Sequence, residues 1–293
     1  MLSLAAGDLR LELAPSVGGA VAGFSHAGFA LMRETPPGIA DVHRFSSFPL
    51  VPFSNRIADG RFSFAGRTYQ LRPNSPEGRH AIHGEGWRQP WSVAEADRCS
   101  ARLILDYRPA EAGSWPFPFR AEQHFMLAGN ELTATLVISN TGAVSAPAGF
   151  GLHPYFLRHD GVTLGFRAET VWRNGDDQLP SERESLPERW DFGAPRPLGA
   201  PGLDNCFAGW QGTAEIAWPA ARRGLRIAAD RCFGHAVVYT PAERDYFAFE
   251  PVSHMNDAIN RMLTTPDHGL VVLAPGESLN GSVRFTISAI SGA

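Results

Sequence analysis

The sequence predicts an all-β fold, a large antiparallel β-sandwich. Apolar and polar residues alternate with a period of two along many short segments, and turns rich in the 30 glycines and 23 prolines separate these segments. Short glycine-containing links join successive segments, which is typical of hairpins and therefore of antiparallel sheets. No long amphipathic helical pattern lies between the segments, so a parallel α/β fold is not expected.

The first half of the chain contains a leading strand and two hairpins. Leu9, Leu11 and Leu13 alternate with polar residues, and Gly18-Gly19 marks a turn after them. Ala65-Gly66 and the segment 128–130 are short links between alternating runs, which predicts a hairpin at each place. The predicted strands of this half cover 9–13, 61–64, 67–71, 101–107, 120–127 and 131–139.

The second half contains further short runs of strand-forming residues. They cover 162–172, 214–218, 225–229, 236–240, 246–250, 269–273 and 282–290. The stretch from Gln178 to Pro201 is rich in proline, arginine and glutamate, but the strands on its two sides have similar composition. We therefore expect a long surface loop rather than a linker, and a single domain over residues 1–293.

Composition excludes several classes of function. The 293 residues carry a formal net charge of −4 and no cluster of Lys and Arg, which argues against nucleic acid as a partner. No apolar run could span a membrane, and Asp8, Arg10 and Glu12 interrupt the first segment, so neither a membrane anchor nor a signal peptide is expected. The cytoplasm is the expected compartment. The three cysteines are widely spaced, which predicts reduced packing residues.

The common catalytic motifs do not occur in the chain. It has no Gly-x-Ser-x-Gly elbow, phosphate-binding Gly-Lys-Ser/Thr loop, dinucleotide glycine fingerprint or His-Glu-x-x-His helix, which excludes the commonest hydrolases, nucleotide enzymes and zinc enzymes. A scattered set of polar residues beside glycine, proline or aromatic residues remains. The set consists of Asn55, Arg56, His80, His83, His153, Asp204, Asn205 and Glu250.

Two members of this set, His153 and Glu250, precede a proline. A residue before proline has an extended backbone, and the proline cannot donate a ladder hydrogen bond, so we expect both side chains at strand ends. An acid–base pair could be held in position there. Structural roles are the alternative: a hydrogen-bonded edge histidine for His153, an ion pair of Glu250 with Arg56 or Arg261, and turn capping for Asp204.

Two other groups of residues allow more than one interpretation. His80 and His83 have the spacing of metal ligands, but no acidic or thiol ligands cluster near them, so no metal site is expected. Four tryptophans could belong to the core or could form a stacking surface for a sugar. They are Trp87, Trp91, Trp115 and Trp210.

Five segments, in this order, resemble the aldose 1-epimerases, the galactose mutarotases. They are Ser54-Asn-Arg-Ile-Ala-Asp-Gly-Arg-Phe62, Ile82-His-Gly-x-Gly-Trp87, Gly151-Leu-His-Pro-Tyr-Phe156, Leu203-Asp-Asn-Cys-Phe207 and Phe249-Glu-Pro-Val-Ser-His-x-x-Asp-Ala258, where x is a position that does not contribute to the resemblance. Residues 9–19 also resemble the opening strand and Gly-Gly turn of that family. The resemblance spans nearly the whole chain and implies the galactose mutarotase-like supersandwich, a large antiparallel β-sandwich.

The resemblance also implies roles for individual residues. Glu250 is the implied general base that takes the proton from the anomeric hydroxyl, and His153 is the acid that protonates the ring oxygen. The implied binding residues for the small-molecule sugar are Arg56, His83, Asp204, Asn55 and Trp87. The chemistry needs no cofactor, and all these residues should converge on one pocket. An ionised carboxylate and an imidazolium are expected to stabilise one another near neutral pH.

A departure from the family pattern leaves the substrate open. His83-Gly-Glu85 stands where the family often has His-Gly-Gly, and the sugar need not be galactose. Arg72, Arg79 and Arg88 leave room for a phosphorylated sugar, as in a hexose-6-phosphate mutarotase. Solvated loop charge is the simpler explanation for these three arginines.

Two alternatives do not involve mutarotation. The same β-sandwich could bind carbohydrate without catalysis. A glycosidase could use Asp204 and Glu250 as its pair of carboxyl groups. The oligomeric state is not indicated by the sequence.

Overall fold

Strands form most of the regular structure in the computed structural model of this protein, which describes residues 1–199 and 202–290. In chain order they are β1 (Leu2–Ala6), β2 (Leu9–Ala14), β3 (Ala20–His26), β4 (Phe29–Ala30), β5 (Pro49–Leu50), β6 (Arg56–Ile57), β7 (Arg61–Phe64), β8 (Arg67–Gln70), β9 (Ala81–Ile82), β10 (Ser92–Ala96), β11 (Ser100–Tyr107), β12 (Phe119–Ala128), β13 (Glu131–Asn140), β14 (Ala146–Ala148), β15 (Gly151–Leu152), β16 (Tyr155–Leu157), β17 (Thr163–Phe166), β18 (Thr170–Asn174), β19 (Pro180–Ser185), β20 (Arg196–Pro197), β21 (Asp204–Ala208), β22 (Thr213–Trp218), β23 (Arg223–Ala229), β24 (His235–Tyr239), β25 (Tyr246–Val252), β26 (Val271–Leu273) and β27 (Ser278–Ala289).

The helices of the described ranges are short. They are α1 (Ala258–Arg261) and the 3₁₀ turns η1 (Val42–Arg44), η2 (Ala58–Gly60), η3 (Gly86–Arg88), η4 (Glu188–Trp190) and η5 (Pro219–Ala221). None of these helices has the length and apolar character needed to cross a membrane.

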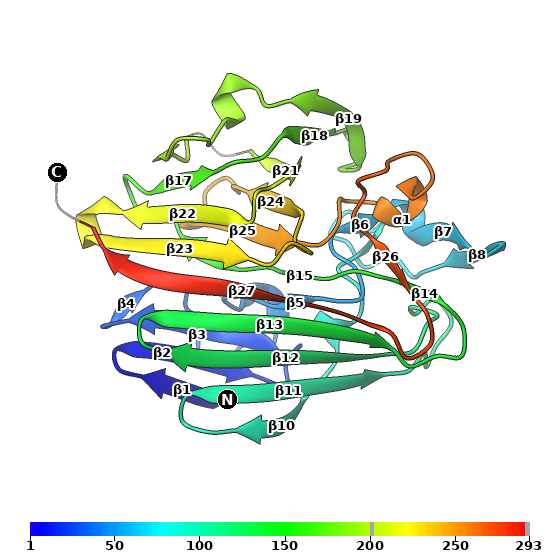
Figure 1. The fold of residues 1–293 in the computed structure, drawn as a ribbon, viewed down its shortest axis with the longest axis horizontal. Helices are drawn as coiled ribbons and strands as arrows, with labels where there is room; N and C mark the ends of the chain where they lie inside the picture. The colour runs from blue at the N-terminus through cyan, green and yellow to red at the C-terminus, as the bar shows by residue number, and fades with distance from the viewer. Residues whose placement is uncertain (200–201, 291–293) are drawn as a thin grey trace.

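Two large antiparallel sheets organise the strands (Figure 1). One has nine strands in the order β10-β11-β12-β13-β27-β23-β22-β17-β20. The other has eight, in the order β19-β18-β21-β24-β25-β15-β5 with β16 also paired to β25. The strands β1 to β4 form a smaller sheet of their own. This arrangement confirms the predicted all-β, antiparallel fold class.

The two large sheets pack face to face around an aromatic core. The ring of Phe166 on β17 lies 5.0 Å from that of Phe207 on β21 and 5.1 Å from that of Phe249 on β25, measured between ring centroids. Such inward-facing rings from both sheets are the core of a β-sandwich. Period-two alternation accounts for the faces, because along β13 the predicted apolar positions are the buried ones.

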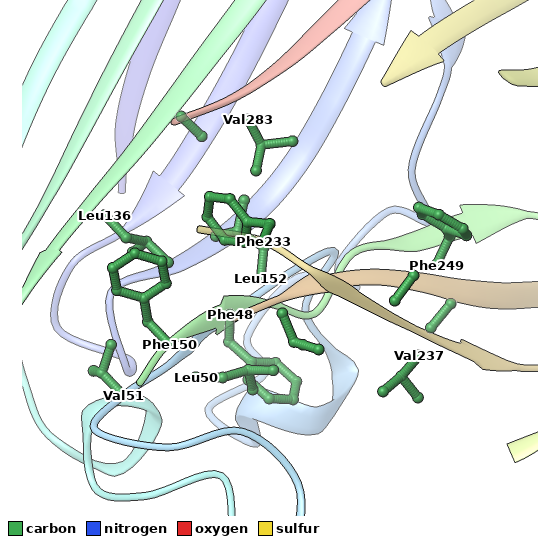
Figure 2. Close-up of a cluster of buried hydrophobic side chains, with 14 of the residues drawn as sticks. Phe48, Leu50, Val51, Leu136, Phe150, Leu152, Phe233, Val237, Phe249 and Val283 are labelled. Atoms are coloured by element: carbon green, nitrogen blue, oxygen red, sulfur yellow. The ribbon is translucent and has the colours of Figure 1, made fainter. Parts of the chain in front are cut away.

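The core continues beneath the segment that carries His153. Phe150, which directly precedes β15, packs on Phe233 with ring centroids 5.1 Å apart. Figure 2 shows these two rings gathered with Leu136 of β13 and Val283 of β27. The backbone before His153 is therefore anchored in the sandwich interior, and the side chain starts from a fixed position.

Two predicted elements are wrong. The run 162–172 is not one strand, because β17 belongs to the nine-stranded sheet and β18 to the eight-stranded sheet. The chain changes sheets between them, which a period-two pattern cannot reveal. The stretch from Gln178 is not only a loop, because it contains β19 and β20, each at the edge of a large sheet. Its charged residues suit an edge strand. Pro201, the end of the predicted loop, lies outside the described residues.

The prediction about strand ends is right for His153 and wrong for Glu250. His153 lies between β15 and β16, whereas β25 continues through Pro251 to Val252. Pro251 is tolerated in β25 because of how the neighbouring strands pair on one side. There, β15 pairs with Val252 and β16 pairs with residues 246–248, so neither strand pairs with Pro251. The missing N–H therefore lies where that side of β25 has no ladder partner.

The glycine at position 149 is expected to be essential for stability. A Cβ atom added to Gly149 would lie 2.2 Å from His254 Cδ2. The His254 ring cannot easily move, because Nε2 accepts from the Ser54 N–H at 3.0 Å and Nδ1 donates to the Met255 carbonyl at 2.8 Å. Gly149→Ala should lower the free energy of unfolding by about 1–3 kcal/mol in denaturant titrations. Gly234→Ala is the control, since nothing lies within 4 Å of its added Cβ; equal losses in both variants would contradict the steric argument.

Candidate active site

Strand register brings His153 and Glu250 together. Gly151 pairs with Val252, and Tyr155 pairs with Ala248. His153 lies midway between Gly151 and Tyr155, and Glu250 lies midway between Val252 and Ala248, so this register places His153 opposite Glu250. The His153 Nε2 atom is 3.3 Å from the Glu250 Oε1 atom. The side chains are only 8% and 3% exposed. The two side chains are therefore adjacent, and the open pocket that they are expected to face stays a prediction.

Aromatic packing fixes the orientation of the imidazole. The His153 ring stacks on Phe48 with centroids 4.7 Å apart and lies 4.5 Å from the ring of Tyr155. The His153 backbone N–H donates to the Phe48 carbonyl at 3.1 Å. Two aromatic rings that also pack on each other, with centroids 6.2 Å apart, therefore restrict the orientation of the imidazole, as a proton-transfer group requires.

Arg56 lies between Glu77 and Asp204. Its Nε donates to Glu77 Oε1 at 2.6 Å, and its Nη1 lies 3.9 Å from Asp204 Oδ2. Asn55 accepts the Arg56 backbone N–H through Oδ1 at 2.9 Å. Asn55 therefore contacts Arg56 directly, and the carboxylates of Glu77 and Asp204 lie on two sides of the Arg56 guanidinium.

His83 approaches His153 from another loop. The two rings meet edge to face with centroids 5.3 Å apart. The Asn55 N–H donates to His83 Nδ1 at 3.1 Å, and the His83 N–H donates to the Asn55 carbonyl at 3.0 Å. Asn55 and His83 have φ angles of 56° and 60°, a left-handed backbone that costs free energy in residues other than glycine.

Trp87 borders the same cluster. It is buried, and its ring lies 6.2 Å from Phe48 and 4.8 Å from His43, centroid to centroid. Its indole N–H has no hydrogen-bond partner among the described residues. Six of the seven predicted site residues are therefore linked by direct contacts, and Trp87 is connected to them through Phe48.

Burial controls the protonation of the pair. It lowers the pKa of His153 to about 3, with a smaller effect of the Arg33 charge, and raises the pKa of Glu250 well above its ordinary value. The expectation of a resting ion pair is therefore wrong, because desolvation outweighs the attraction between opposite charges. Burial thus favours the uncharged form of each of the two groups. Burial also raises the pKa of Asp204 and lowers that of His83.

His80 has a structural role. Its Nδ1 accepts the Asp59 N–H at 2.9 Å, and its Nε2 lies 3.0 Å from the Asp177 carbonyl. The His83 ring points into a different environment, so the metal-like spacing does not produce a shared site. Over the described ranges, no group of three or more His, Cys, Asp or Glu side chains could hold a metal ion.

The arginines considered for a phosphorylated sugar are on the surface. Each forms an ion pair with a carboxylate, as expected for solvated loop charge. The pairs are Arg72 with Glu111, Arg79 with Asp59 and Arg88 with Glu85. Glu85, the departure from the family pattern, also accepts the Trp115 N–H at 3.2 Å, so it fastens a neighbouring loop.

The sequence did not single out three residues that contact the cluster. Phe48 and Tyr155 hold the His153 ring, and Glu77 holds Arg56. Tyr155 lies inside a recognised segment, and its ring so close to the histidine could have been noticed there. Phe48 and Glu77 carry no local signal, because their contacts depend on how distant loops meet.

Several buried polar atoms in and beside this cluster have no hydrogen-bond partner among the described residues. Burying such atoms is costly, and they are normally satisfied by water or a ligand. They are Ser54 Oγ, Trp87 Nε1, His153 Nδ1, Glu250 Oε2, and Asn256 Oδ1 and Nδ2. A ligand that offers many hydroxyl groups would complement them.

The stacked antiparallel sheets and their buried histidine–glutamate pair define a protein of the galactose mutarotase-like fold. A galactose mutarotase-like protein from Clostridium acetobutylicum superposes with a TM-score of 0.87 at 18% identity, over 98% of this chain and 95% of that one. The sequence model of aldose 1-epimerase matches residues 2–286. The chain belongs to the aldose 1-epimerase family.

A protein sequence and a crystal structure from Escherichia coli match the chain almost completely. YphB of strain K12, described as uncharacterised, is 34% identical over 97% of this chain and 98% of its own length. A crystal structure described as a proposed aldose 1-epimerase of strain K12 has a TM-score of 0.90 and 30% identity, and covers 98% of each chain. Family membership supports an isomerase of the epimerase type acting on a sugar.

Proposed function

We propose that this protein is an aldose 1-epimerase that interconverts the α and β anomers of a free aldohexose, with Glu250 as base and His153 as acid. The observation that supports this most is the 3.3 Å approach of the His153 and Glu250 side chains in a buried cluster of unpartnered polar atoms. Opening the sugar ring requires one group that removes a proton and another that donates a proton, and a buried acid–base pair supplies both.

The proposed reaction transfers two protons. Glu250 removes the proton from the anomeric hydroxyl while His153 protonates the ring oxygen, so that the bond between C1 and the ring oxygen breaks and the open-chain aldehyde forms. Rotation about the C1–C2 bond and the reverse transfers produce the other anomer. The anomeric and ring oxygens share one carbon, so two adjacent side chains can reach both.

The charge state at rest is compatible with this reaction. A carboxylic acid with a neutral imidazole contains the same number of protons as a carboxylate with an imidazolium. Transfer of the shared proton from Glu250 to His153 when the sugar binds would generate the reactive form without any proton from solvent. The hydrogen bonds of the sugar to the carboxylate would favour that transfer.

Arg56, Asp204 and His83 are proposed to bind sugar hydroxyls, with Asn55 holding Arg56 and Trp87 forming the wall. A guanidinium donates hydrogen bonds and a carboxylate accepts them, so together they suit a diol. The guanidinium of Arg56 lies near Glu77 and Asp204, which leaves little net positive charge for an anionic sugar. We therefore favour a neutral aldose over a sugar phosphate.

We also propose that residues 1–293 act as one domain. The nine-stranded sheet takes strands from β10 to β27, and the eight-stranded sheet takes strands from β5 to β25, so the two are interleaved along the chain. No single division of the chain would therefore separate the strands of one sheet from the strands of the other.

Polarimetry tests the proposed function. Purified protein should accelerate the decay of optical rotation of freshly dissolved α-glucose or α-galactose. Released reducing ends from a glycoside would indicate a glycosidase instead, and calorimetric binding without acceleration would indicate a carbohydrate-binding protein. Activity on hexose 6-phosphates alone would contradict the preference for a neutral sugar.

The pH profile of kcat/KM is expected to be a broad bell. Activity requires one titratable proton on the His153–Glu250 pair. It should fall in acid, when His153 is protonated while Glu250 keeps its proton, and in base, when Glu250 loses its proton. Because burial lowers the pKa of His153 to about 3 and raises that of Glu250, the plateau should cover neutral pH. Rates corrected for spontaneous mutarotation, measured where circular dichroism is native, check this. An acid limb near the ordinary histidine pKa of about 6.5 would contradict it.

A further inference from the structure

Asn256 has a buried side chain whose polar atoms the fold does not use. It is 1% exposed, and neither Oδ1 nor Nδ2 has a hydrogen-bond partner among the described residues. Burying such an amide costs free energy, because its hydrogen bonds to water are lost on folding and no hydrogen bonds within the protein replace them. The cost would be avoided by an apolar side chain of the same size, so the amide needs an explanation other than stability.

Its backbone contacts place Asn256 between two parts of the proposed site. The next residue, Asp257, donates its N–H to the Arg56 carbonyl at 2.9 Å. On the other side, the Asn256 N–H approaches the thiol of Cys206 on β21. Asn256 therefore lies where the loop after β25 meets both the Arg56 segment and the eight-stranded sheet.

The face of the sheet beneath Asn256 is the one that carries Glu250. Cys206 pairs with Val237 on β24, and Val237 pairs with Glu250 on β25. Side chains directly opposite one another in adjacent strands lie on the same face of a sheet. Two strand spacings, about 10 Å, separate Cys206 from Glu250, a distance that a bound monosaccharide can bridge. Glu250 Oε2 is also buried and unpartnered.

We propose that Asn256 is a substrate-binding residue, whose amide forms hydrogen bonds with a ring hydroxyl of the sugar held between Arg56 and Glu250. This proposal rests on the proposed function. An amide donates through Nδ2 and accepts through Oδ1, and a hydroxyl can serve both roles. A site built around such a group discriminates against sugars that lack the matching hydroxyl, so Asn256 would contribute to the choice of aldose.

Asn256→Leu separates binding from stability, because leucine has a similar size and no polar atoms. The melting temperature of the free variant should equal or exceed that of the wild type, while kcat/KM falls on the order of 10- to 100-fold through a raised KM. Asn256→Ala is a second variant, which removes the amide without the risk that leucine disturbs the packing. It should show the same fall in kcat/KM. The control is Asn140→Leu, which removes an amide that donates to the Val144 and Leu273 carbonyls at 2.8 Å. It should lower the melting temperature and leave kcat/KM of the folded protein unchanged.

The outcomes distinguish this proposal from the proposed function. Wild-type kcat/KM in Asn256→Leu and Asn256→Ala would overturn the role of Asn256 and leave the mutarotase assignment standing. A fall in melting temperature like that of Asn140→Leu, with unchanged kinetics, would do the same. If the wild type does not accelerate mutarotation, the proposed function fails. Calorimetry with glucose and galactose then decides: weaker binding by Asn256→Leu supports the role of Asn256, and equal or absent binding overturns it.

Discussion

Glu250→Gln is expected to lower kcat for mutarotation about 10²- to 10⁴-fold, the range that a positioned general base contributes. Glutamine has nearly the shape of glutamate, and the position is 2% exposed, so the packing around it should persist. What the amide cannot do is take the proton from the anomeric hydroxyl. The loss should therefore appear in kcat more than in KM.

The same variant should become relatively more stable as the pH rises. Burial raises the folded-state pKa of Glu250 above its unfolded value, so the stability that the protonated carboxyl supports is present at low pH and is lost as pH rises through the folded pKa. Glutamine has no such loss. The difference in melting temperature between Glu250→Gln and the wild type should therefore grow as the pH rises above the ordinary glutamate pKa of about 4.3.

Glu122→Gln is the matched control for both measurements. Glu122 lies on β12 outside the proposed site, and its pKa is lowered, because its ion pairs with His124 and Arg102 outweigh its partial burial. Its removal should leave kcat unchanged and should give no relative gain in stability at high pH. If Glu250→Gln keeps the wild-type kcat, Glu250 is not the base.

The strands were the most predictable part of the fold. Where a strand has one buried face, as in β12 and β13, period-two alternation follows directly from burial and can be recognised without a structure. The pattern says nothing about which sheet a strand joins. That is why 162–172 looked continuous although β17 and β18 lie in different sheets.

The site was predictable only where a segment had a recognisable local form. His153 and Glu250 were noticed because each precedes a proline, yet only strand register shows that they are opposite one another. Asn256 lies at a position of a recognised segment that does not contribute to the resemblance, and it was not singled out because the absence of hydrogen-bond partners is a property of the folded chain. Protonation was predicted wrongly for a similar reason: it depends on the depth of burial, and sequence does not report depth.

The second large effect is expected for His153→Gln, with a loss of about 10²- to 10⁴-fold in kcat because the ring oxygen would no longer receive a proton from a positioned acid. The loss should not add to that of Glu250→Gln. The two groups share one proton and work in the same step, so once either is removed the other has little left to contribute. A double variant that is slower than each single variant by the product of their separate losses would contradict this coupling.

Stability in acid provides an independent measure of the His153 environment. The folded-state pKa of about 3 is lower than the unfolded value, so the folded protein takes up fewer protons there and loses stability as pH falls from about 6.5 towards 3. His153→Gln removes this loss, which amounts to about 2 kcal/mol at pH 5. His235, whose pKa burial lowers to about 4, is the control, because His235→Gln should give a similar gain in acid stability with kcat unchanged. Urea unfolding at pH 5 and pH 7 measures both variants. A gain in acid for His235→Gln without one for His153→Gln would mean that the His153 imidazole is already protonated in the folded protein, so that no proton transfer from Glu250 would be needed when the sugar binds.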